Sequence, residues 1–217
     1  MLPPPRFVRE AASRPSLPSW MFDCMSLTEI ARRLRDEGRF ESGRALTNRP
    51  KMFLGAVENP FAPPYDWRPL RLAKKIAAGA QFIQTQYCFD VPLLRRFMSR
   101  LDDLGLLDQV FILVGVGPLP SAKTAEWLRR QVAGVHIPDA VVQRLAGAAK
   151  PKAEGRKLCV ELIQEIREIK GVSGVHVMAY RQEEAVAEVI DASGVLNGRI
   201  PWYPERHKRL LQEKVAP

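Results

Sequence analysis

The chain of 217 residues has few cysteines and no long apolar run, and each absence excludes certain classes of protein. Its three cysteines, Cys24, Cys88 and Cys159, lie far apart without a CxxC pair. This argues against a disulfide framework and a zinc site, and favours a reducing cytosol. No stretch approaches the roughly 18 apolar residues of a membrane-spanning helix, and the first 20 residues lack the apolar segment of a secretory signal. We therefore expect a cytoplasmic protein that makes no membrane contact.

The charge of the chain is strongly positive, at +9, but it is not concentrated in one segment. Basic residues are interspersed with acids, as in ARRLRDEGRFESGR at 31–44. Such mixing is typical of solvated helix faces, so we expect no nucleic-acid partner. A surplus of positive charge instead suits small anionic substrates such as phosphates or polyglutamates. The length allows one full core and argues against a second large domain.

The pattern of apolar residues predicts an α/β fold. Residues 1–22 are rich in proline and are interpreted as an irregular arm, and residues 204–217 as a basic tail. Ser26 is expected to cap a first helix that runs to Glu37, with Glu29 completing a capping box. Strands are predicted at 52–57, 82–86, 110–116 and 175–179. Helices are predicted at 67–78, 93–104, 121–131, 138–148, 153–169 and 183–193.

Alternation of strands and helices implies parallel strands, either in an open doubly wound sheet or in part of a (β/α)₈ barrel. The first strand is followed by Glu58-Asn59-Pro60-Phe61, which is not the glycine-rich turn of a Rossmann fold. A complete barrel typically needs about 250 residues, and only four strands are predicted here. The third strand, 110–116, is almost entirely apolar, which predicts burial on both of its faces.

Polar or glycine residues follow all four predicted strands, as is typical of the catalytic face of a parallel sheet. The four strand ends carry Glu58 and Asn59, Gln84 and Gln86, Gly115-Val116-Gly117, and Tyr180-Arg181-Gln182. Gly115 and Gly117 are compatible with a ligand that approaches the backbone or with a tight turn.

Gln84 and Gln86 are the strongest candidates for ligand binding. Amides donate and accept hydrogen bonds together, which suits the edge of a heteroaromatic ring better than a phosphate. Lys74 and Lys75 precede them on a helix, where they either meet a pyrophosphate or are solvated. We interpret His176, in the fourth strand, as a hydrogen-bonded core histidine.

Four segments carry a family resemblance: FLGAVENPFAPP, RLAKKIAAGAQFIQTQYCFD, GVHIPDAVVQRL and IREIKGVSGVHVMAYRQEEAVAEVI. Together they resemble the carboxyl-terminal two-thirds of a methylenetetrahydrofolate reductase barrel, over residues 23–203. The resemblance implies a (β/α)₈ flavoprotein of one-carbon metabolism. In that family FAD takes hydride from NADH or NADPH and passes it to methylenetetrahydrofolate, giving methyltetrahydrofolate. By position, Gln86 matches the glutamine near the flavin that hydrogen-bonds the pterin, and Gln84 lies beside it as a second substrate-binding amide.

The resemblance also implies cofactor contacts. Lys75 matches the lysine near the FAD phosphates, and Lys74 stands where an arginine is common. Asn59 takes the place of a flavin-contacting tyrosine, with Val57 beside it at a backbone contact. A cation here would balance the charge of a pyrophosphate.

The chain departs from the family at several points. An aromatic residue that often stacks on the folate falls near Ala122, and the tyrosine of the last strand falls near Met178. The early strands, which supply the acidic residue thought to protonate N10 of the substrate, have no counterpart here. We therefore expect either a truncated product or a subunit whose barrel is completed by another copy or by a partner chain. The second alternative includes a non-catalytic, reductase-like subunit.

Overall fold

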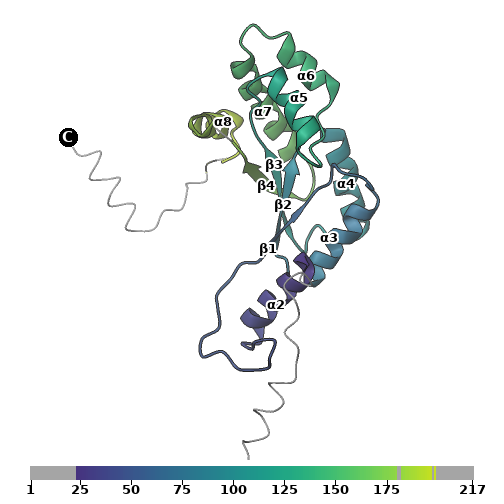
Figure 1. The fold of residues 1–217 in the computed structure, drawn as a ribbon, viewed down its shortest axis with the longest axis vertical. Helices are drawn as coiled ribbons and strands as arrows, with labels where there is room; N and C mark the ends of the chain where they lie inside the picture. Colours follow the sequence, from purple (N-terminus) through teal and green to yellow (C-terminus); the bar gives the residue numbers. More distant parts are fainter. Residues whose placement is uncertain (1–22, 180–181, 197, 199–217) are drawn as a thin grey trace, which may run out of the picture.

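A computed structural model describes residues 23–179, 182–196 and 198 of the chain. Its centre is a parallel sheet whose four strands lie side by side in chain order (Figure 1). The strands are β1 (Gly55–Glu58), β2 (Phe82–Tyr87), β3 (Phe111–Val116) and β4 (Val172–Val177). Each neighbouring pair is parallel, so at least one helix connects every strand to the next. Four parallel strands that alternate with helices form an incomplete TIM-barrel-like fold, as the sequence predicted.

The helices follow the predicted order, with small changes at their ends. They are α2 (Cys24–Asp36), α3 (Trp67–Ala77), α4 (Val91–Asp103), α5 (Ala122–Gln131), α6 (Asp139–Ala146), α7 (Pro151–Arg167) and α8 (Val186–Ser193), with a 3₁₀ turn η2 (Glu183–Ala185) before α8. Gly79, Gly105 and Gly194 follow α3, α4 and α8 with positive φ angles, which end these helices.

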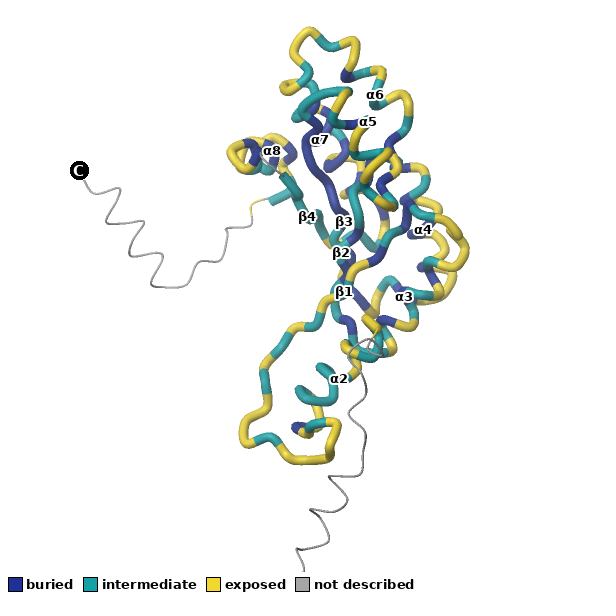
Figure 2. The backbone as a smooth tube through the Cα atoms, in the orientation of Figure 1, coloured by how far each residue is buried: buried dark blue, intermediate teal, exposed yellow. Residues whose placement is uncertain are grey.

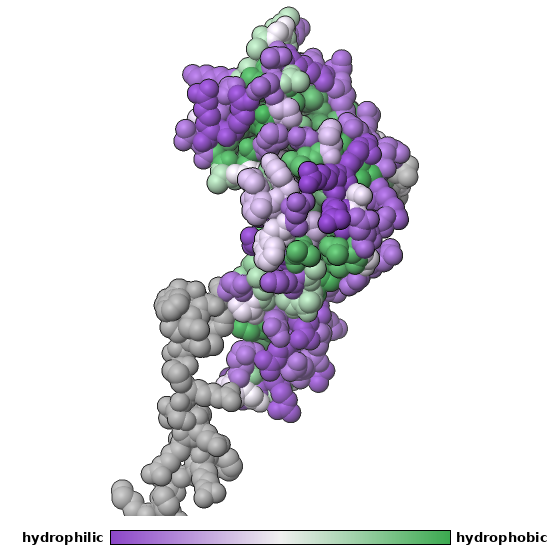
Figure 3. Space-filling model, turned by 90° about the vertical axis from the view of Figure 1, so that its right-hand side faces the viewer, coloured by the Kyte–Doolittle hydropathy of each residue, from purple (hydrophilic) through white to green (hydrophobic). Residues whose placement is uncertain are grey.

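The hydrophobic core lies between the sheet and the helices that cover its outer face. Ile83, Ile112 and Val114 point to this side and are fully buried. Figure 2 shows the buried segments along the strands and on the inner sides of the helices. The outside of the helical layer near α3 and α4 is mostly hydrophilic, with smaller hydrophobic areas (Figure 3).

The opposite, inner face of the sheet is not covered by the described residues. Phe111 of β3 is 57% exposed and Val57 of β1 is 67% exposed. The prediction that the third strand is buried on both faces is therefore wrong at Phe111. The apolar run predicted a covering layer on each face of the sheet. In the described part of the chain, helices cover only the outer face, and a run of apolar residues does not reveal this.

Three of the differences from the predicted elements have a clear local cause. Asp23, and not Ser26, caps α2, because its carboxylate accepts hydrogen bonds from the backbone N–H groups of Met25 and Ser26. β1 begins at Gly55, and not at Met52, because the N–H of Leu54 bonds to the side chain of Gln81 instead of to a strand. β4 spans Val172–Val177 instead of 175–179, since its pairing with β3 begins at Val172.

The proposed arm at 1–22 and tail at 204–217 lie outside the described residues, so their boundaries stay predictions. In the described residues, no helix is long and apolar enough to cross a membrane. The three cysteines, all within this part, are free thiols. Cys88 is fully buried, and burial raises the pKa of its thiol.

Candidate functional site

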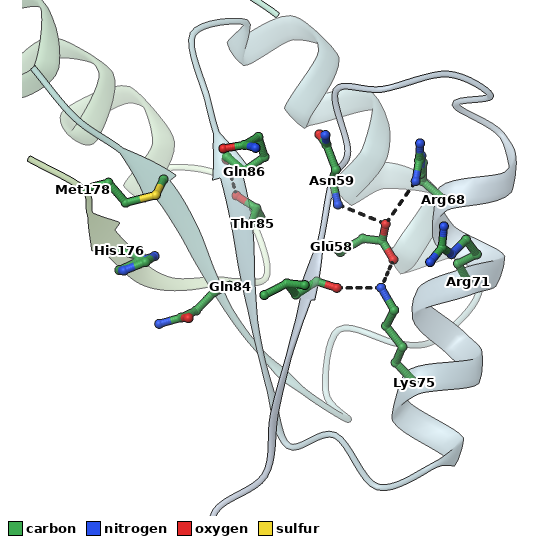
Figure 4. A pocket seen from close by; sticks show the side chains of 11 residues that line it. Glu58, Asn59, Arg68, Arg71, Lys75, Gln84, Thr85, Gln86, His176 and Met178 are labelled. Carbon is green, nitrogen blue, oxygen red and sulfur yellow. Dashed lines mark hydrogen bonds and ion pairs between the residues drawn. The ribbon is translucent and has the colours of Figure 1, made fainter. Parts of the chain in front are cut away.

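A pocket of about 410 Å³ opens at the carboxyl ends of the strands and reaches α3 (Figure 4). Such a position is the usual place for a ligand in a fold of this kind. The wall formed by α3 carries cations, and the wall formed by β2 carries uncharged amides. The lining residues are Val57, Glu58, Asn59, Arg68, Arg71, Lys75, Gln84, Thr85, Gln86, His176 and Met178.

Glu58 and Lys75 form a buried ion pair between the end of β1 and the last turn of α3. The Lys75 Nζ lies 2.6 Å from Glu58 Oε2 and donates a second hydrogen bond to the carbonyl of Val57 at 2.5 Å. Arg68 approaches the same carboxylate at 3.6 Å. Lys75 therefore holds β1 against α3, and one of its three ammonium donors remains for a ligand.

Arg71 is the cation of the pocket whose guanidinium is least engaged. In the described part of the chain it has no hydrogen bond or ion pair, whereas Arg68 donates to the carbonyls of Ala62 and Pro63. Lys74 points elsewhere: it is exposed, and its ammonium lies 5.5 Å from the centre of the Trp67 ring. Neither arginine was predicted from the sequence as a site residue. Their spacing of three residues, one helical turn before Lys75, is the signal that could have found them.

Gln84 and Gln86 both line the pocket, together with the end of β4. The side chain of Gln84 has no hydrogen-bond partner among the described residues, so both ends of its amide are available. The Oε1 atom of Gln86 accepts a hydrogen bond from the N–H of Tyr87 at 3.0 Å. The carbonyl end of Gln86 is thus held by the backbone, and its amino end remains free to donate to a ligand.

Asn59 lines the pocket, but its side chain is used by the protein. Its Nδ2 donates to the carbonyl of Gly134 at 2.9 Å, and its Oδ1 accepts from the N–H of Phe61 at 3.0 Å. Val57 also lines the pocket, with its carbonyl bonded to Lys75. The cofactor contacts predicted for Asn59 and Val57 stay predictions. Ala122 begins α5 and does not line this pocket, whereas Met178 does.

Gly117, directly after β3, is needed for close packing within the protein, not for contact with a ligand. A Cβ on Gly117 would lie 2.1 Å from the carbonyl oxygen of Met178 and 2.6 Å from the Tyr87 ring. The Tyr87 hydroxyl donates to that same carbonyl at 3.0 Å, which ties β2 to the end of β4. Of the fourth strand end, Tyr180 and Arg181 lie outside the described residues. Gln182 is buried and donates to the carbonyl of Pro118 at 3.1 Å.

His176 differs from its interpretation as a hydrogen-bonded core residue. It lines the pocket between Gln84 and Met178 (Figure 4), and its buried Nδ1 atom has no hydrogen-bond partner in the part of the chain described. The alternation of polar and apolar residues in a strand shows that the His176 side chain lies on one face of the sheet. The alternation does not show whether that face is a closed core or lines an open pocket.

No group of three or more His, Cys, Asp or Glu side chains within the described ranges is arranged to hold a metal ion. The carboxylate that lines the pocket, that of Glu58, is bonded to Lys75 and to the N–H of Asn59 at 3.0 Å. It is therefore a structural group of the site. The pocket is lined by three cations and one carboxylate, which give it a net charge of +2. The amides of Gln84 and Gln86 line its other wall. This combination suits a ligand with an anionic part and a polar, flat ring.

Comparison with solved structures shows a related fold. One similar structure is an uncharacterised protein from Clostridium thermocellum that binds two copies of 5-methyl-5,6,7,8-tetrahydrofolic acid. The two chains share 18% sequence identity with a TM-score of 0.51, over 75% of this chain and 67% of that one. Residues 57–194 match the family model for methylenetetrahydrofolate reductase. Because this match spans more than half of the sequence and includes β2, β3, β4 and the end of β1, the chain belongs to the methylenetetrahydrofolate reductase family.

Proposed function

We propose that the protein is a flavin-dependent oxidoreductase of one-carbon metabolism. It reduces methylenetetrahydrofolate to methyltetrahydrofolate, with NADH or NADPH as the reductant and FAD as the cofactor. The observation that carries this proposal is the pocket with arginines on one wall and uncharged glutamines on the other. Membership of the family supports it, and so does the folate bound by the similar Clostridium thermocellum protein.

The residues of the pocket fit FAD. Arg71 and Arg68 lie one helical turn apart on α3, where they can meet a pyrophosphate, and Lys75 has one donor left beside them. Gln84 and Gln86 face the pocket from β2, where amide groups can read the edge of a flavin or pterin ring. When bound, FAD supplies the hydride chemistry.

The protein's own contribution to this reaction is to bind and orient the rings. Gln86 offers its amino group at a fixed position, because its carbonyl is held by the N–H of Tyr87. A fixed donor aligns the substrate against the cofactor, and alignment is a large part of catalysis in hydride transfer. Glu58 is held by Lys75 and Arg68, so we assign no proton donor among the described residues that line the pocket.

Titration of the purified protein with FAD and with 5-methyltetrahydrofolate tests the proposal. Gln86→Ala should weaken folate binding about tenfold, the value of one lost hydrogen bond, whereas Gln164→Ala, on the exposed side of α7, should leave it unchanged. A wild-type protein that binds neither flavin nor folate would refute the assignment. Equal affinities of the Gln86 variant and the wild type would remove Gln86 from the site.

Arg71 can be tested separately with two flavins. Arg71→Met should weaken FAD binding about tenfold or more, since a charge-assisted contact to a phosphate is lost. Riboflavin has no phosphate, so its affinity should stay the same. Arg100→Met is a matched control, because Arg100 is an exposed arginine on α4 that pairs with Asp103. Equal losses for both flavins would mean that Arg71 does not contact the pyrophosphate.

A second candidate function is that of a reductase-like subunit that pairs with another copy or with a partner chain. It is favoured by an aromatic cluster on the inner face of the sheet, formed by Phe53, Phe82 and Phe111. The Phe53 ring stacks on Phe82 at 5.3 Å and lies 6.1 Å from Phe111, and both Phe53 and Phe111 are more than half exposed. Exposed apolar clusters commonly mark interfaces. Light scattering after size exclusion tests the pairing with another copy: a monomer at all concentrations argues against self-association.

A further inference from the structure

We propose that Thr85 is a positioning residue of the pocket. Its hydroxyl holds a β-bulge in β2, and this bulge aims the amide of Gln86 at the ligand. The inference rests on the proposed function for the identity of the ligand, but the bulge itself can be tested without any ligand.

The bulge lies where β2 pairs with β3. Gln84 is opposite Leu113, and Tyr87 is opposite Gly115. Two residues of β2, Thr85 and Gln86, therefore oppose the single residue of β3 between those partners, which is the definition of a bulge. An extra residue changes the direction of the side chains that follow it. Bulges are rare between parallel strands such as these, and they are over-represented beside active sites, where they re-aim one side chain.

The Thr85 hydroxyl completes the hydrogen bonding that the bulge interrupts. The N–H of Gly115 in β3 donates to Thr85 Oγ1 at 2.9 Å, so a side chain of β2 bonds to the backbone of β3 at the bulge. Thr85 Oγ1 in turn donates to the carbonyl of Gln86, also at 2.9 Å. The side chain is buried, so without the hydroxyl both backbone groups would lose a partner that water cannot easily replace.

The bulge also fixes the orientation of the Gln86 side chain. Because the N–H of Tyr87 donates to Gln86 Oε1, the side chain is folded back onto its own backbone. Its Nε2 atom then presents hydrogen-bond donors to the pocket. We infer that Gln86 recognises an acceptor on the ligand, such as a carbonyl oxygen or an unprotonated ring nitrogen.

Gly115 is the second requirement of this arrangement. A Cβ at this position would lie 2.5 Å from the carbonyl oxygen of Thr85, 2.8 Å from that of Gln86 and 2.6 Å from the end of Met178. Only a residue without a side chain lets β3 approach the bulged strand this closely. A threonine hydroxyl on one strand and a glycine on the next therefore act together.

Two matched pairs of proteins at position 85 separate the hydroxyl from the rest of the side chain. Wild type and Thr85→Val differ by a hydroxyl replaced with a methyl group, and Thr85→Ser and Thr85→Ala differ by the hydroxyl alone. The first measurement is amide hydrogen exchange at Gly115, by NMR on the full chain. The second is affinity for 5-methyltetrahydrofolate by calorimetry, with the melting temperature as a check of folding.

The proteins that keep the hydroxyl should behave alike. Thr85→Ser should protect the Gly115 amide and bind folate within about threefold of the wild type. Thr85→Val and Thr85→Ala should exchange Gly115 about tenfold faster and bind folate about tenfold more weakly, the value of one lost hydrogen bond. If Thr85→Val does not fold, the Ser and Ala pair still decides the question.

Two results would overturn the inference. One is wild-type exchange at Gly115 in a folded protein without the hydroxyl. The other is folate binding by Thr85→Ser that is as weak as that of Thr85→Ala. If the wild type binds no folate, the proposed function fails, but exchange at Gly115 still shows whether the hydroxyl holds the bulge.

Discussion

The two faces of the sheet carry alternate residues of the same strands, yet their environments are opposite. On the outer face, Ile83 and Ile112 are fully buried under helices. On the inner face, Gln84 lines the pocket and Phe111 is mostly exposed. Stability therefore depends mainly on the outer face, while binding depends on the inner one. This division lets residues change on the inner face without loss of the fold, and it can be tested residue by residue.

The buried ion pair of Lys75 and Glu58 joins α3 to the end of β1 beside the pocket. A change to this pair should have the largest effect on stability. Lys75→Met leaves the buried Glu58 carboxylate without its 2.6 Å partner. Breaking a buried ion pair in this way costs about 3–5 kcal/mol. The free energy of unfolding, measured by urea denaturation, should fall by that amount.

The double variant Glu58→Gln/Lys75→Met is the control for this prediction. It removes both charges, so it should be more stable than Lys75→Met alone, because no unpaired charge remains buried. If Lys75→Met is as stable as the wild type, Arg68 at 3.6 Å is sufficient to hold Glu58. The pair would then not join β1 to α3, and Lys75 would be free for a phosphate.

Truncation of Ile112 should have the next largest effect. Ile112→Ala removes a fully buried side chain from the outer face and should cost about 2–5 kcal/mol. Val57→Ala, on the inner face, should change stability by only about 0.5 kcal/mol or less, because Val57 is already exposed. Urea denaturation of both variants tests the comparison directly. A large loss for Val57→Ala that grows with protein concentration would show that another chain covers the inner face.

The fold was largely predictable from the sequence because its signals are local. Apolar runs such as 110–116 fix the strands, and glycines such as Gly79 and Gly105 end the helices through positive φ angles. The cap of α2 was assigned wrongly because Asp23 and Ser26 are both good capping residues, three positions apart. Sequence alone does not decide between two such neighbours.

The site was predictable only in part because its geometry depends on non-local contacts. The position of Gln84 and Gln86 at the pocket follows from the end of a buried strand. The pairing of Lys75 with Glu58, 17 residues apart, depends on how α3 packs on β1, and the bulge depends on the register of β3. Neither has a signature within a single segment, so the ion pair of Lys75 and the role of Thr85 became visible only in the structure.

Substitution of a charged residue in the helical layer outside the core should have the smallest effect on stability. Arg144 of α6 pairs with Glu154 at 2.6 Å and with Glu161 of α7 at 2.5 Å, and the hydrogen bond from Arg144 lowers the pKa of Glu161 below 4.5. Because the folded-state pKa is the lower one, this pair stabilises the protein above about pH 4.5 and loses its effect as the pH falls further. The side chains of both partners are partly exposed to solvent, at 33% and 42%, so Arg144→Gln should cost only about 1 kcal/mol or less at pH 7.

The difference between wild type and Arg144→Gln should therefore be constant from neutral pH down to about pH 5 and should shrink in more acidic solution. Urea denaturation at a series of pH values measures it. Arg100→Gln is the control, since Arg100 makes a single exposed pair within one helix and should show almost no difference at any pH. A loss of several kcal/mol for Arg144→Gln would mean that the outermost helices, and not only the buried face of the sheet, determine the stability of this fold.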